Sequence, residues 1–227
     1  MSTLRGFFVT GTDTNVGKTT ISCALIATLQ QRDLKVAGMK PIASGAARTA
    51  NGLRNDDAVT LQRAAAIDVA YDWVNPYCFA DPIAPHIAAK NARQTIDIGI
   101  IVTRAKQLLS KADVLIVEGI GGWKVPLNDD YTSADLAVAL GLPVVLVVGL
   151  RLGCINHALL TSDSIAQHGL KLTGWIANSV SPRLDAERDI VDTLRQRLPA
   201  PCWGHVPYLP YATPQNIAPH LRLPERL

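Results

Sequence analysis

Short apolar segments alternate with longer segments of helical periodicity along most of the chain. Several apolar segments are continuous runs of Val, Ile and Leu, which are typical of strands covered on both faces. The predicted strands are Gly6–Thr10, Val36–Lys40, Val114–Val117, Val144–Val148, Gly174–Ala177 and Trp203–Val206. The predicted helices are Lys18–Arg32, Asp56–Ala66, Pro85–Ala92, Ile96–Lys111, Ser133–Leu140, Ile155–His168 and Asp185–Arg197. This alternation predicts an α/β fold, with a mostly parallel sheet flanked by helices on both faces.

Length and composition favour one globular domain. The chain has 227 residues, of which 48% are hydrophobic and 18% charged. A chain of this length is expected to form a single domain over residues 1–227. Prolines are frequent from about residue 199, which predicts an irregular tail lying over that domain. The net charge is only +3, and no long Lys/Arg run is present, so nucleic acid is not expected as a partner.

The spacing of the cysteines and the length of the apolar runs indicate the cellular compartment. Cys23, Cys78, Cys154 and Cys202 are far apart and form no CxxC pair, so free thiols are expected rather than a zinc site. The first predicted strand begins within a few residues of the start, which argues against a signal peptide. No apolar run approaches the roughly 18–20 residues needed to cross a bilayer. We therefore expect a cytoplasmic protein with no membrane partner.

The segment Phe7–Thr20, FFVTGTDTNVGKTT, carries the most informative pattern. A predicted strand breaks into a Gly/Thr/Asp-rich loop that ends in Gly17-Lys18-Thr19, where a predicted helix begins. Such a loop directs backbone N–H groups at one point beside a helix N-terminus, which suits nucleotide phosphates. Lys18 is expected to reach the terminal phosphates, and the Thr19 hydroxyl to bind Mg²⁺. The pattern predicts a P-loop NTPase-like fold.

The loop departs from the usual spacing. Five residues separate Gly11 from Gly17 instead of four, and Thr12 stands at the expected glycine position. The alternative is an ordinary strand-to-helix turn, capped by a Thr or Asp side chain, which needs no lysine at that position.

Ligands of parallel α/β sheets bind beyond the carboxyl ends of the strands, so polar residues at those ends are candidates. Lys40 follows the second predicted strand and is either a surface lysine or a second cation for the terminal phosphate. Asp56 and Asp57 open a predicted helix and either cap it or supply a carboxylate for Mg²⁺. Whether Asp56 contributes as well as Asp57 stays open.

Two further strand ends carry candidates. Glu118 ends the run Val-Leu-Ile-Val-Glu and precedes Gly119 and Gly121. An acid at this place is typical of metal-positioning acids in nucleotide hydrolases, whereas the glycines alone indicate only a flexible turn. Asn178 ends the fifth predicted strand and is either a turn former or a reader of the adenine edge, because its amide both donates and accepts.

Taken together, these segments resemble the dethiobiotin synthetase family. The resemblance extends from about residue 6 to residue 209, and the longer glycine spacing of the phosphate loop is a feature of that family. The matching segments are FFVTGTDTNVGKT, AGMKPIASG, GLRNDDAVTLQ, VNPYCFADPIAPHIAA, VLIVEGIGGW, PVVLVVGLRLGCINHALLT and GWIANSV.

The resemblance implies an ATP- and Mg²⁺-dependent ligase of biotin biosynthesis. It implies a homodimer that converts 7,8-diaminononanoate, CO₂ and ATP to dethiobiotin, ADP and phosphate. Lys40 is implied as the catalytic lysine, assisted by Lys18 and Thr14. The implied Mg²⁺ ligands are Thr19, Asp57 and Glu118. The implied nucleotide-binding residues are Asn15, Val16, Gly17, Lys18, Thr19, Thr20, Asp57, Glu118, Gly119, Ile120, Gly121, Asn178, Ser179, Pro207, Tyr208 and Leu209.

The diamine site is implied to lie at the dimer interface. Thr14 and Ser44 would line it, and the helix start formed by Gly153, Cys154, Ile155 and Asn156 would hold the substrate carboxylate across that interface. An anion at a helix N-terminus meets unpaired N–H groups and a favourable dipole. Ser179 stands where many relatives have Asp, so the choice between ATP, CTP and other nucleotides stays open.

Two other functions are compatible with the phosphate loop. A partitioning or metal-delivery switch ATPase usually carries a lysine early in the loop, but the corresponding residue here is Asp13. An amidating synthetase of corrin metabolism normally carries an attached glutaminase domain, for which this chain has no room.

Overall fold

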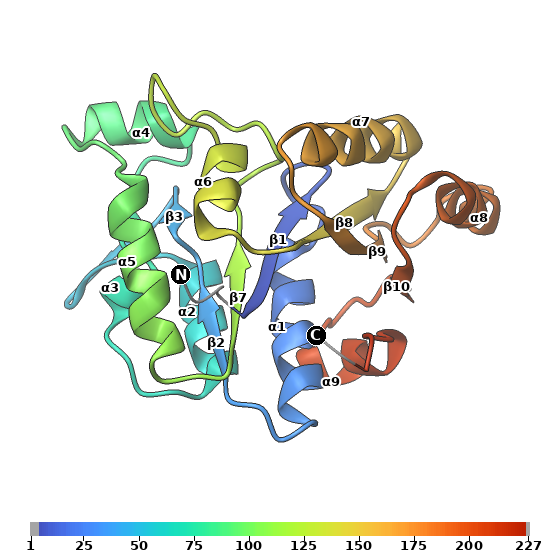
Figure 1. Ribbon diagram of the computed structural model, residues 1–227, viewed down its shortest axis with the longest axis horizontal. Helices are drawn as coiled ribbons and strands as arrows, with labels where there is room; N and C mark the ends of the chain where they lie inside the picture. The colour runs from blue at the N-terminus through green and yellow to red at the C-terminus, as the bar shows by residue number, and fades with distance from the viewer. Residues whose placement is uncertain (1–4, 226–227) are drawn as a thin grey trace.

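The structure of the protein is a computed structural model that describes residues 5–225. Its centre is a six-stranded sheet in the order β10-β9-β8-β1-β7-β2, in which every neighbouring pair is parallel (Figure 1). The strands are β1 (Gly6–Gly11), β2 (Val36–Met39), β7 (Val114–Glu118), β8 (Val144–Leu150), β9 (Leu172–Ser179) and β10 (Cys202–Val206). The predicted parallel α/β fold is therefore confirmed, and all six predicted strands are present, each end within two residues of its expected position.

Helices cover both faces because successive residues of a strand point to opposite sides. In β1, Phe7 and Val9 pack in the cluster that contains α1 (Lys18–Gln30), whereas Phe8 packs in the cluster that contains α5 (Ile98–Leu109). Figure 1 shows α5 and α1 on opposite sides of the sheet. The other long helices are α2 (Asp56–Ala65), α6 (Ser133–Leu140), α7 (Cys154–Gln167) and α8 (Glu187–Arg197).

Small elements between β2 and β7 cover the end of the edge strand. The two-residue strands β3 (Ile42–Ala43) and β6 (Tyr77–Cys78) pair in parallel, and β4 (Ala47–Thr49) forms an antiparallel pair with β5 (Gly52–Arg54). The short helices α3 (Tyr71–Val74) and α4 (Pro85–Asn91) complete the region. Of these, only α4 was predicted, because elements of two to four residues leave no periodicity to detect.

The prediction of an irregular tail is wrong for part of the C-terminal segment. Residues Pro214–Ile217 form the helix α9, and Ala218–His220 continue it as a 3₁₀ turn. Thr213 and Asn216 form a capping box at its start. Ile217, Leu221 and Leu223 are buried in the cluster that contains α1, and Arg32 donates to the Leu223 and Pro224 carbonyl oxygens at 3.1 and 2.7 Å. The segment is therefore an ordered cover on α1.

Within residues 5–225, no helix combines the length and the apolar character that a bilayer crossing requires. The four cysteines are free thiols, as expected.

Candidate active site

The phosphate loop joins β1 to α1 at the carboxyl edge of the sheet. Gly17 has a left-handed backbone with φ of 87°, and a Cβ there would lie 2.3 Å from Asn178 Nδ2. Val16 is buried in the core under the loop, and Thr12 N–H donates to Val147 O at 3.0 Å. Gly17 caps α1 without any side-chain hydrogen bond. The alternative of a turn capped by Thr or Asp is therefore wrong, and the first N–H groups of α1 are left for an anion.

Lys18 is buried at the base of this loop. The residue is 7% exposed, and its Nζ donates to Asp13 O at 2.7 Å. Burial, and then the nearby Lys40 charge, lower the pKa of Lys18 to about 8. An anionic phosphate oxygen at this point would satisfy the ammonium better than a carbonyl oxygen does.

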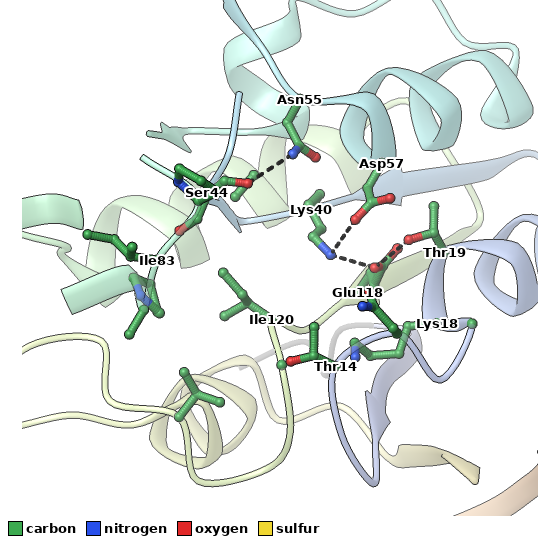
Figure 2. A pocket seen from close by; sticks show the side chains of 18 of the residues that line it. Thr14, Lys18, Thr19, Lys40, Ser44, Asn55, Asp57, Ile83, Glu118 and Ile120 are labelled. Atoms are coloured by element: carbon green, nitrogen blue, oxygen red, sulfur yellow. Dashed lines mark hydrogen bonds and ion pairs between the residues drawn. The ribbon is translucent and has the colours of Figure 1, made fainter. Parts of the chain in front are cut away.

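Lys40, Glu118, Asp57 and Thr19 form one polar cluster, which combines the residue after β2 with residues of β7, α2 and α1 (Figure 2). Lys40 Nζ lies 2.5 Å from Glu118 Oε1, 3.3 Å from Asp57 Oδ2 and 3.3 Å from Gly119 O. Thr19 Oγ1 donates to Glu118 Oε1 at 2.9 Å. Met39 pairs with Val117 in the sheet, so the residues that follow them, Lys40 and Glu118, meet at the strand ends. Lys40 is therefore a buried cation of the site, not a surface lysine.

The carboxylates hold the Lys40 ammonium in its charged state. Burial alone would lower the pKa of Lys40, but Glu118 and Asp57 outweigh it and raise that pKa above its ordinary value. The ion pair with Glu118 is buried on both sides, with side-chain exposures of 6% and 1%. Lys40 is therefore positively charged at neutral pH.

The donor set fits Mg²⁺ bound together with a nucleotide. Glu118 Oε2 is buried without a hydrogen-bond partner among the described residues, although a buried carboxylate oxygen normally has one. The Thr19 hydroxyl and the Asp57 carboxylate lie beside it. Among residues 5–225, no group of three or more His, Cys, Asp and Glu is placed to hold a metal alone. Magnesium in nucleotide sites takes one or two carboxylates and completes its octahedron with phosphate oxygens and water.

A cavity of about 900 Å³ opens beside this cluster. One side is polar, and Ser44 contributes to it with a buried Oγ that has no hydrogen-bond partner within residues 5–225. The other side is apolar and comes from the segment before α4 and the loop after β7. Figure 2 shows Thr14, Ser44, Ile83 and Ile120 around the opening. The lining residues are Thr14, Asn15, Gly17, Lys18, Thr19, Thr20, Lys40, Ala43, Ser44, Asn55, Asp57, Pro82, Ile83, Ala84, Pro85, Glu118, Ile120, Gly121 and Val125.

Most sequence-predicted residues meet at this cavity. Of the two adjacent acids, Asp57 lines it, whereas Asp56 is exposed and does not. Val16 lies beneath the loop, and Gly119 offers its carbonyl to Lys40. The sequence missed Asn55, Ala43, Val125 and the apolar segment Pro82–Pro85. Asn55 had a detectable signal, because an Asn before two acids is a typical helix N-cap, and its Oδ1 accepts from Ala58 N–H.

The residues expected to contact the nucleotide base lie at the ends of β9 and β10. Asn178 Nδ2 donates to Val16 O at 2.9 Å and so contacts the phosphate loop from β9. Ser179 Oγ donates to Glu187 Oε1 at 2.9 Å and lies 3.3 Å from His205 Nε2. The segment 207–209 follows β10, whose last residue Val206 pairs with Asn178. These residues do not line the cavity but lie along the same sheet edge.

The start of α7 lies apart from the cavity within one chain. Gly153 caps α7 with φ of 90° and without a side-chain hydrogen bond. Cys154 is buried, whereas Asn156 is exposed and the preceding Leu152 is 97% exposed. Arg151, at the end of β8, forms an ion pair with Asp13 of the phosphate loop.

Comparison with known proteins decides the family. A family model described as an AAA domain matches residues 5–216. The ATP-dependent dethiobiotin synthetase BioD of Aromatoleum aromaticum is 47% identical over 224 residues, which cover 99% of this chain and 100% of the relative. The chain belongs to the dethiobiotin synthetase family. The same synthetase of Pseudomonas aeruginosa is 49% identical over 221 residues, which cover 97% of both proteins.

Two solved structures are similar to this dethiobiotin synthetase in fold, at low sequence identity. The MinC:MinD cell division complex of Aquifex aeolicus aligns with a TM-score of 0.56 at 18% identity, covering 91% of this chain and 82% of the other. The signal recognition particle receptor FtsY of Elizabethkingia anophelis aligns with a TM-score of 0.54 at 14% identity, covering 96% and 62%. The sequence-based resemblance is confirmed: the protein is an ATP-dependent ligase that forms dethiobiotin in biotin biosynthesis, with ATP as cosubstrate.

Proposed function

We propose that the Lys40–Glu118–Asp57–Thr19 cluster and the phosphate loop carry out this reaction, with 7,8-diaminononanoate and CO₂ in the adjoining cavity and Mg²⁺ on the phosphates. The observation that carries the proposal is the buried Lys40 ammonium, held by two carboxylates at the strand edge that faces the loop. In this proposal residues 1–227 act as one catalytic domain.

The reaction needs three bond-forming steps and no covalent protein nucleophile. A neutral amine of the diamine attacks CO₂ and gives a carbamate. A carbamate oxygen attacks the γ-phosphorus of ATP, and the bond to the β-phosphate oxygen breaks as ADP leaves. The second amine attacks the carbonyl of the mixed anhydride, phosphate leaves, and the five-membered cyclic urea closes. The protein must therefore orient the carbamate against the phosphate and neutralise charge.

Fixed positive charge supplies most of that neutralisation. The N–H groups at the start of α1 and the Lys18 ammonium would bind the phosphates, and Lys40 would lie against the transferred phosphoryl group. Bound Mg²⁺, held by Thr19, Asp57 and Glu118, would neutralise phosphate oxygens further. Thr14 and Ser44 would receive the polar end of the diamine, and the buried Ser44 Oγ, which has no partner in the described part of the chain, supports that role.

The apolar side of the cavity suits the rest of the substrate. Ile83, Ile120 and Val125 present aliphatic surface next to the polar cluster, as a methylene chain requires. The same side chains would keep water from the mixed anhydride, which water would hydrolyse. The base of the nucleotide is proposed to lie against Asn178 and Ser179 and the segment Pro207–Leu209 at the sheet edge.

We further propose a homodimer in which Gly153–Asn156 of one protomer binds the substrate carboxylate in the site of the other. The helix start has N–H groups without a side-chain cap, and it does not reach the cavity of its own chain. The almost fully exposed Leu152 beside it suits burial by a second copy.

The test is phosphate release from ATP by the purified protein. Release that requires Mg²⁺, the diamine and bicarbonate together supports the proposal, with dethiobiotin identified as the product by mass spectrometry. Equal ATP turnover without the diamine would instead favour a switch ATPase and overturn the assignment of the cavity.

A further inference from the structure

The main chain of Lys40 is fixed by groups from outside the central sheet. Lys40 follows β2, the edge strand of the central sheet, so among residues 5–225 only β7 pairs beside it in that sheet. On the other side, Lys40 N–H donates to Val74 O at 2.9 Å, and Asn75 Nδ2 donates to Lys40 O at 2.6 Å. The segment that contains α3 therefore holds both polar main-chain groups of the residue that carries the buried ammonium.

Asn75 can make these contacts in one orientation only. The residue is 3% exposed, and its Nδ2 also donates to Tyr77 O at 3.1 Å. Its Oδ1 accepts from the Tyr71 hydroxyl at 2.9 Å. Each hydrogen of the amide and its oxygen has a partner, so a flipped or rotated amide would leave buried polar groups unpaired.

The Tyr71 hydroxyl links Asn75 to the helix that carries Asp57. Besides donating to Asn75, it accepts from Asn55 N–H at 2.9 Å. Asn55 is the N-cap of α2, and Asp57 lies in the first turn of that helix, 3.3 Å from Lys40 Nζ. One hydroxyl therefore connects the main chain of Lys40 with the start of the helix that supplies its second carboxylate.

The Tyr71 hydroxyl stays protonated and can therefore donate to Asn75. Burial raises the pKa of Tyr71 to about 12, so the proton stays on the oxygen throughout the neutral range. The Arg54 guanidinium lies over the ring, 4.1 Å from its centroid, and fixes the ring plane. Neither Tyr71 nor Asn75 is among the residues that line the cavity, so an effect on catalysis would act through the groups they hold, which are Lys40 and the start of α2 with Asn55 and Asp57.

We infer that Tyr71 and Asn75 are positioning residues, which set the Lys40 ammonium relative to Asp57 for phosphoryl transfer. The inference rests on the proposed function for its kinetic readout. Small displacements are sufficient, because a misplacement of about 1 Å can cost on the order of 100-fold in rate.

Tyr71→Phe tests the inference, because it removes the hydroxyl and keeps the ring over which Arg54 lies. The matched control is Tyr77→Phe. The Tyr77 hydroxyl accepts from Asp97 N–H at 2.9 Å, and Asp97 caps α5 as Asn55 caps α2. Both variants therefore lose a tyrosine hydrogen bond to the backbone of a helix N-cap, but only the Tyr71 hydroxyl also bonds Asn75. Tyr77 contacts Asn75 through its main-chain oxygen, which phenylalanine keeps.

We expect kcat of Tyr71→Phe to fall about tenfold or more, with KM for ATP nearly unchanged. We expect Tyr77→Phe to keep kcat within about twofold, although its melting temperature falls at least as much. Asn75→Ser, which breaks the bond to Lys40 O directly, is the second variant and is expected to show the same loss of kcat. Equal kcat in Tyr71→Phe and Tyr77→Phe, or kcat that follows the melting temperature across all three variants, would overturn the inference.

A second measurement distinguishes failure of this inference from failure of the proposed function. If the wild-type protein shows no diamine-dependent phosphate release, the crystal structures of the two tyrosine variants decide the inference. A Lys40–Asp57 ion pair that is lost or split into two conformers only in Tyr71→Phe supports it. An unchanged pair in both variants overturns it.

Discussion

Asn178 Nδ2 lies against Gly17, so close that a Cβ on Gly17 would stand 2.3 Å from it. The same nitrogen donates to Val16 O at 2.9 Å. Strand β9 thus contacts the phosphate loop through Asn178, and residue 17 has room for a hydrogen only.

Gly17→Ala is therefore expected to lose magnesium-dependent ATP affinity by about tenfold or more, because the clash displaces the N–H groups of the loop. Isothermal titration measures the affinity. Gly141→Ala is the control, since Gly141 also has a positive φ, of 64°, but open space around its Cβ position. Both variants bear a left-handed strain of about 1 kcal/mol, and only the first should lose nucleotide. Equal ATP affinity in the two variants would show that the loop tolerates the methyl group.

Removal of the Lys40 ammonium should separate stability from catalysis. Lys40→Met leaves Glu118 buried without its cation, which is expected to destabilise the fold by about 3–5 kcal/mol. Turnover should fall at least about 100-fold, because a fixed charge on the phosphoryl group is lost. The double variant Lys40→Met with Glu118→Gln should recover stability in urea unfolding but not turnover. Recovery of both would remove Lys40 from the reaction.

Lys18 gives ATP binding a specific pH dependence. Its pKa is lowered to about 8 from the model-peptide value of 10.5, so between these values the unfolded chain binds more protons than the folded one. The stability contributed by this group therefore rises as pH increases from about 8 to 10.5. A bound triphosphate favours the charged ammonium, so ATP binding above pH 8 should take up a proton and weaken with rising pH.

Calorimetry in buffers of different ionisation enthalpy measures that proton uptake. Lys18→Arg should abolish it, because arginine stays charged. Lys40 should contribute none, because its pKa is raised. Proton uptake that persists in Lys18→Arg would assign it to another group.

Adjacent acids provide a test of the magnesium ligands. Asp57 lines the cavity and contacts Lys40, whereas Asp56 is exposed and is not among the lining residues. Both lie in the first turn of α2, so their removal costs the same interaction with the helix dipole. Asp57→Asn should raise the Mg²⁺ concentration for half-maximal activity by about 10- to 100-fold, and Asp56→Asn should leave it unchanged. Identical Mg²⁺ titrations would exclude Asp57 as a ligand.

The proposed dimer is tested at Leu152, whose side chain is 97% exposed beside the start of α7. Leu152→Asp should weaken self-association, because it would bury a charge in the contact. Sedimentation equilibrium measures the dissociation constant. Tyr211→Asp is the control, at an 88% exposed residue near α9. A wild-type protein that sediments as a monomer at assay concentration would contradict the shared site.

Several parts of the site were predictable because their signals are local. The phosphate loop needs its strand, its glycine and its lysine within a few consecutive residues, so Lys18 and Thr19 could be assigned from the pattern. Glu118 was predictable because it ends an otherwise apolar strand. The long strands and helices were predictable for a similar reason, since burial on one or both faces imposes a period on the sequence.

Lys40, Asp57 and Asn178 were less certain, because their neighbours in space lie tens of residues away in the chain. The tyrosine hydroxyl and the amide that hold Lys40 left no signal, since one hydrogen bond imposes no pattern on the sequence.

The sequence by itself determined the alternation of strands and helices, the phosphate loop and the family. Only the tertiary structure decided that Asp57 and not Asp56 meets Lys40, that the C-terminal segment forms an ordered cover on α1, and that Asn75 fixes the lysine. The physical reason is that hydrophobic periodicity is a property of consecutive residues in the sequence. A buried ion pair and its hydrogen-bonded supports depend instead on which strand ends the sheet places side by side.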